Sequence, residues 1–70
     1  MFWWFERKGS YARCEVLELP NGGYELRVID PEGSERVEYF DDANELASRQ
    51  RAVEEGLTSE GWTGPHGVVW

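Results

Sequence analysis

Cysteine and histidine are almost absent from this sequence, which contains one of each, Cys14 and His66. A lone cysteine forms no internal disulfide, so the disulfide frameworks of small secreted proteins are excluded within one chain. A structural zinc site usually takes four Cys or His ligands, and only these two are present. We therefore expect no disulfide within the chain, no metal and no cofactor, and a cytoplasmic location where thiols stay reduced.

Long hydrophobic runs and positive charge are also scarce. The apolar run at residues 2–5 precedes the first charges, whereas a secretory signal places its charges first, and a membrane-spanning helix needs about 20 apolar residues. Seven Lys and Arg oppose fourteen Asp and Glu, which gives a formal net charge of −7. Since Lys and Arg supply most of the affinity for phosphate backbones, we expect a soluble protein with no membrane segment and no nucleic-acid partner.

Aromatic residues, by contrast, are abundant: four Trp, three Tyr and three Phe in 70 residues. A chain of this length buries only about 60% of the surface that its unfolded form exposes. A core of this size usually contributes no more than roughly 3–5 kcal/mol, so small proteins need unusually dense packing, disulfides, a metal or self-association. Since neither a disulfide nor a metal site is expected, the composition predicts one aromatic-rich domain over residues 1–70 that either packs tightly or pairs with a second copy.

Turn signals divide the first 40 residues. Gly9-Ser10 and Asn21-Gly22 are dipeptides typical of two-residue hairpin loops, and the Asp-Pro-Glu-Gly sequence at residues 30–33 is typical of a longer turn. Tight turns between alternating apolar residues predict an antiparallel meander in sequential order. The expected strands cover about residues 2–8, 11–19, 23–30 and 35–40.

Side-chain parity predicts how these strands pair, because neighbours across a ladder project to the same face. If the third turn covers residues 31–34, Leu26 lies opposite Tyr39, and Arg27 lies opposite Glu38. The second strand does not satisfy both of its neighbours with one parity. An extra residue would resolve the conflict, so we predict a β-bulge near residues 15–17.

A helix is expected over residues 43–60. Asp42 followed by Glu45 is typical of a capping box, and Gly61 suits the left-handed stop after the last turn. Apolar residues recur every three or four positions, with Leu46, Val53 and Leu57 at the centre of the stripe. The sequence thus predicts an α+β fold: a four-stranded antiparallel meander of order 1-2-3-4, one C-terminal amphipathic helix on one face, and an irregular tail at residues 61–70.

A resemblance supports this order of elements. From Tyr24 onward the chain has a strand, a Pro-x-Gly turn, a strand ending in Tyr-Phe-Asp-Asp, a helix with Arg49-Gln50, and a Gly-Trp-Thr-Gly-Pro-His-Gly tail. In these features, and in its aromatic start, the chain resembles a group of short, uncharacterised bacterial proteins. That group has no assigned activity, so the resemblance implies a fold and no site.

No catalytic constellation is visible. His66 has no positioned partner in the sequence and is interpreted as an exposed or structural loop histidine. Cys14 alternates with apolar residues on the expected core face, where a thiol behaves as a small hydrophobe. The acidic pairs at residues 41–42 and 54–55 are explained by helix capping and by a solvated face. We predict no catalytic, cofactor-binding or metal-binding residue, and no enzyme activity.

The first strand poses a question that the sequence leaves open. If Trp3 and Phe5 face the helix, Phe2 and Trp4 face outward on an edge strand without early charges, with Ile29 and Phe40 adding apolar area. Either residues 61–70 cover this strand or a partner does.

The partner hypothesis predicts a non-enzymatic protein-interaction module, with a homodimer through the first strand as its expected form. The alternative is a small-ligand or single-stranded nucleic-acid binder that stacks bases on aromatic side chains, although the negative charge opposes nucleic acid.

Overall fold

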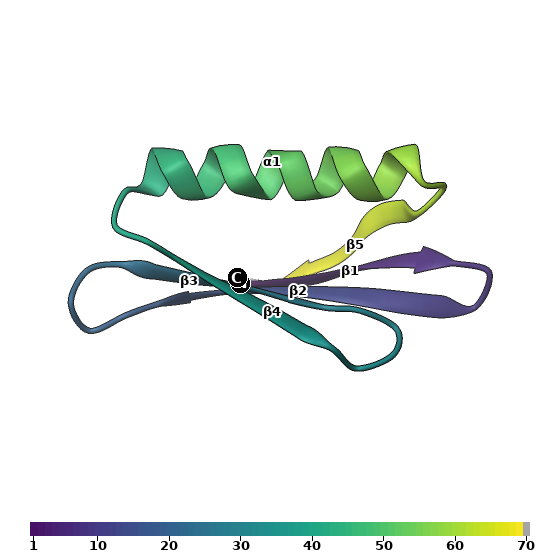
Figure 1. Cartoon of the computed structure of the whole chain (residues 1–70), viewed down its shortest axis with the longest axis horizontal. Helices are drawn as coiled ribbons and strands as arrows, with labels where there is room; N and C mark the ends of the chain where they lie inside the picture. Colours follow the sequence, from purple (N-terminus) through teal and green to yellow (C-terminus); the bar gives the residue numbers. More distant parts are fainter. Residues whose placement is uncertain (70) are drawn as a thin grey trace.

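Five strands and one helix make up the computed structural model of the chain, which describes the backbone of residues 1–69 and the side chains of residues 1–68. In chain order they are β1 (Phe2–Arg7), β2 (Ser10–Glu18), β3 (Tyr24–Ile29), β4 (Glu35–Phe40), α1 (Ala43–Ser59) and β5 (Thr63–Val69). The strands form one antiparallel sheet in the order β4-β3-β2-β1-β5, and α1 lies across one face (Figure 1). The predicted α+β class, antiparallel sheet and single helix are confirmed.

The prediction of a four-stranded sheet with an irregular tail is wrong. The tail forms β5, which pairs with β1 and makes a fifth strand (Figure 1). The paired positions are Phe2 with Val69, Trp4 with His66, and Glu6 with Thr63, with irregularities between them. An edge strand such as β1 presents a row of unpaired backbone groups, and β5 supplies their partners. Trp70, the last residue of the predicted tail, lies outside the described residues.

Three-residue loops explain why the pairing expected between β2 and β3, and between β3 and β4, is wrong. The β2–β3 and β3–β4 connections are residues 20–22 and 31–33, and each ends on a glycine with positive φ, Gly22 (89°) and Gly33 (92°). Gly22 N–H donates to the Leu19 carbonyl (3.0 Å), and Gly33 N–H donates to the Asp30 carbonyl (2.9 Å). Loops of this length shift the pairing by one residue from that expected for two or four residues.

The shift places Leu26 opposite Glu38 and Arg27 opposite Val37, in place of the predicted Tyr39 and Glu38 partners. It also removes the conflict that suggested a β-bulge. Strand β2 pairs with β3 without interruption from Arg13 to Glu18, so the predicted bulge near residues 15–17 is wrong.

Both ends of α1 follow their local sequence. The Asp42 carboxylate caps the first turn by accepting a hydrogen bond (2.7 Å) from a backbone N–H two residues on. At the other end Gly61 N–H donates to the Thr58 carbonyl and Trp62 N–H to the Leu57 carbonyl, both at 3.1 Å, which is a Schellman motif. The predicted bounds of the helix are confirmed to within one residue.

The core lies between α1 and the sheet. Its buried residues come mostly from the strands: Trp3, Phe5, Ala12, Cys14, Val16, Leu26 and Leu46. From the helix only Leu46 is buried, whereas Val53 and Leu57 are half-buried. The β3–β4 turn swings away from α1, so the C-terminal half of the helix covers that hairpin incompletely (Figure 1).

Candidate interaction surface

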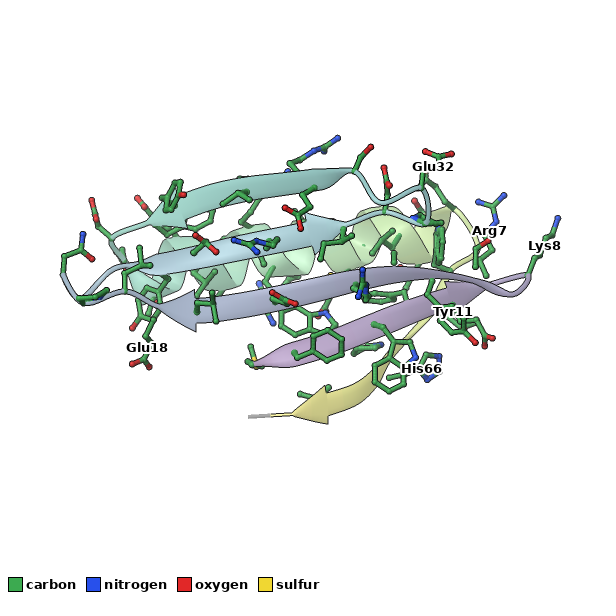
Figure 2. All side chains as sticks on the ribbon, turned by 90° about the horizontal axis from the view of Figure 1, so that it is seen from below. Arg7, Lys8, Tyr11, Glu18, Glu32 and His66 are labelled. Atoms are coloured by element: carbon green, nitrogen blue, oxygen red, sulfur yellow. The ribbon has the colours of Figure 1, made fainter. Side chains whose placement is uncertain are left out.

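Phe2 and Trp4 lie on the face of the sheet that is opposite α1, as the parity argument predicted. Their ring centroids are 6.1 Å apart, and the Trp4 ring is 6.3 Å from the His66 ring on β5. All three side chains are half-buried. They form a short aromatic row that joins β1 to β5, and His66 marks the β5 end of this row in Figure 2.

Two glycines let β5 approach this aromatic strand closely. A Cβ built on Gly67 would overlap the six-membered ring of the Trp4 indole, and one built on Gly64 would come within 2.8 Å of the Phe5 ring. Gly67 also has φ of 58°, a conformation that other residues rarely adopt. The aromatic start of the chain therefore holds the tail, and Trp4 is a packing partner of β5.

Ile29 and Phe40, the other residues of the predicted surface, are not brought together. Ile29 lies on the open face but is only 7% exposed. Phe40 pairs with Tyr24 and packs against the core on the helix side. Its expected outward position was wrong because the three-residue β3–β4 loop changes the parity of β4.

The open face exposes a different set of apolar side chains. Tyr39 is 68% exposed, Tyr11 51% and Leu17 47%. Glu25 separates Leu17 from Tyr39 in one cross-strand row, while Tyr11 lies toward the β1–β2 turn (Figure 2). Sequence reasoning missed Tyr39 and Leu17. Their period-two positions would have revealed them once the loop lengths were right.

Charges of both signs lie between these residues. The Arg27 guanidinium is 3.0 Å from the Glu25 carboxylate, and Glu25 is 8% exposed. Arg27 Nε is buried without an acceptor among the described residues. Glu15 lies opposite Arg27, and Arg13 precedes Glu15 on the same strand. The open face is therefore a mixed surface of exposed apolar side chains and paired charges.

Neither Cys14 nor His66 has a catalytic partner among the described residues. Cys14 is fully buried, and burial, followed by the nearby Glu54 charge, raises the pKa of its thiol to about 12. His66 Nε2 lies 3.2 Å from the Thr63 hydroxyl, which donates to the Glu6 carbonyl. Neither arrangement provides a nucleophile with an activating base.

Within residues 1–69 there is no group of three or more His, Cys, Asp and Glu side chains that could hold a metal ion. In that same part of the chain no helix is long and apolar enough to cross a membrane. No protein-family model, curated protein or solved structure is significantly similar to the chain. The resemblance to short bacterial proteins therefore stays a prediction.

Proposed function

We propose that the chain is a small non-enzymatic protein-interaction module that forms a homodimer through the open face of its sheet. The observation that carries the proposal is the exposure of Tyr11, Leu17 and Tyr39 on a face that α1 leaves uncovered. Aromatic side chains dominate the energetics of protein interfaces. Association would also bury apolar surface that this small core leaves in water.

The face is favoured over either edge of the sheet. Strand β1, the expected edge, is paired with β5. Strand β4 carries Glu35, Arg36 and Glu38, and such charges discourage strand addition. Strand β5 contains Pro65, which lacks an N–H donor, and its pairing with β1 is irregular. The homodimer hypothesis therefore moves from the first strand to the open face.

A second copy suits this face because its charges alternate in sign. A two-fold axis brings the same patch of each copy together, so the Arg13 and Arg27 side chains of one chain can approach Glu15 of the other. Each chain carries a net charge of −7, which repels a second copy at long range. Salt screens that repulsion, so the proposed dimer should become more stable as ionic strength rises.

Sedimentation over a dilution series tests the proposal. The unmodified chain should change from monomer to dimer as its concentration rises, and Leu17→Arg should shift that transition by about tenfold or more, the effect of losing a central interface residue. Ser48→Arg adds the same charge on the exposed side of α1 and should leave the transition unchanged. A chain that stays monomeric at millimolar concentration and moderate salt would contradict the homodimer.

A further inference from the structure

A groove lies on the other side of the sheet, between α1 and the β3–β4 hairpin. Its volume is about 540 Å³, within the range of ligand pockets. The apolar lining includes Ala12, Val28, Val53, Leu57 and Trp62. All but Ala12 are half-buried, because the hairpin turn swings away from the helix (Figure 1). The groove is separate from the open face, so it is independent of the proposed homodimer.

The helical wall of the groove contains two small residues. Ala52 and Gly56 lie one turn apart and both line it. Gly56 needs no special backbone conformation, and a Cβ built on it would meet nothing within 4 Å. Glycine lowers helix propensity relative to alanine, and no contact in the described structure offsets that loss. The missing side chain leaves room for a group that the chain itself does not supply.

The rim of the groove is negative. Four acidic and two basic side chains line it: Asp30, Glu35, Glu38, Glu60, Arg36 and Arg49. Arg49 is already neutralised by Glu38, since its Nε lies 2.9 Å from the carboxylate. Arg36 is the remaining cation of the lining, against three acids. An apolar floor under an acidic rim complements an apolar side chain flanked by positive charges.

We propose that this groove binds a short peptide segment of a partner protein, with an aliphatic or aromatic anchor flanked by Lys or Arg. The anchor side chain would pack on Val53, Leu57 and Trp62, and the backbone of the bound peptide would pass over Gly56. A second copy is a poor occupant of this groove, because the rim is acidic and the chain has few Lys and Arg side chains to place on it.

Selection from a displayed library of random heptapeptides tests this, with the whole chain as the immobilised target. The recovered peptides should be enriched in an apolar residue beside Lys or Arg, and their synthetic forms should bind in fluorescence anisotropy. Gly56→Phe fills the groove and should weaken binding by about tenfold or more, whereas Leu17→Arg, on the open face, should change affinity by less than about twofold. Ala52→Phe, from the same wall, replaces Gly56→Phe if the latter loses its folded circular dichroism spectrum.

Failure to enrich any such peptide would overturn the proposal, as would peptides that bind equally well to the chain and to the folded groove-filling variant. Loss of binding in Leu17→Arg alone would also overturn it, because the peptides would then occupy the open face. The homodimer is measured separately by sedimentation, so either proposal can fail without the other.

Discussion

Gly67 lies directly against the indole ring of Trp4, with no space between them for a side-chain carbon. This contact explains the bulky aromatic start of the chain. Considered alone, the first strand is an edge strand with no charged residue among its first positions. Trp4 forms a surface on which β5 packs, and β5 in turn pairs with the backbone of β1.

The first prediction is that Gly67→Ala destabilises the protein by about 1–3 kcal/mol, because the added methyl overlaps Trp4 and the position has positive φ. Urea unfolding followed by tryptophan fluorescence measures this change. Gly61→Ala is the control, since Gly61 also has positive φ but an added Cβ meets nothing within 4 Å. Equal losses in the two variants would mean that backbone strain alone, rather than contact with Trp4, makes glycine necessary at position 67.

The second prediction is a gain in stability. Gly56→Ala should stabilise the folded chain by about 0.8–1 kcal/mol, the difference in helix propensity between the two residues. The substitution should not disturb packing, since the new Cβ lies in open space. Thermal unfolding gives the change, and a loss of stability would show that the groove is tighter than the structure indicates.

The third prediction concerns the ion pair between Glu38 on β4 and Arg49 on α1, whose Nε is 2.9 Å from a carboxylate oxygen. Both side chains are partly exposed, so a double-mutant cycle with Glu38→Gln and Arg49→Gln should give a coupling of about 0.5–1 kcal/mol. The coupling should shrink at high salt. Absence of coupling at low salt, together with coupling between Glu38 and Arg27, would restore the register that the sequence suggested.

The fourth prediction is a pH dependence from Cys14. Burial raises the pKa of its thiol from 9.0 to about 12, so the unfolded chain releases this proton at lower pH than the folded chain does. The contribution of the buried neutral thiol to stability is therefore complete below pH 9 and is lost as pH rises toward 12. The free energy of unfolding should fall more steeply over this window in the unmodified chain than in Cys14→Ala. Parallel curves for the two proteins would mean that the thiol is not buried in this way.

Local signals in the sequence predicted most of the fold. The cap at Asp42 and the stop at Gly61 set the helix within one residue, and alternation placed Trp3, Phe5 and Cys14 in the core. These features depend on neighbours in sequence or on parity within one strand. They can therefore be predicted without knowing which strands pair.

Loop length and long-range pairing could not be predicted in the same way. Asn21-Gly22 is typical of a two-residue hairpin loop, yet the loop begins at Pro20, and this one-residue difference moves the whole register. The tail has little apolar alternation and contains Pro65, so it did not indicate a strand. It becomes β5 because β1 offers an unpaired edge and Gly67 fits against Trp4. The candidate surface followed these errors, since Phe40 was placed outward and Tyr39 inward.

We propose that the chain associates through the open face of its sheet, and backbone amide shifts measured over a concentration series locate the surface where it associates. As the protein concentration rises, we expect shifts to move at Leu17, at Tyr39 and at their neighbours on β2, β3 and β4, while those along the exposed side of α1 stay fixed. Shifts that move along α1 instead, or that do not move up to millimolar concentration, would contradict association through the open face.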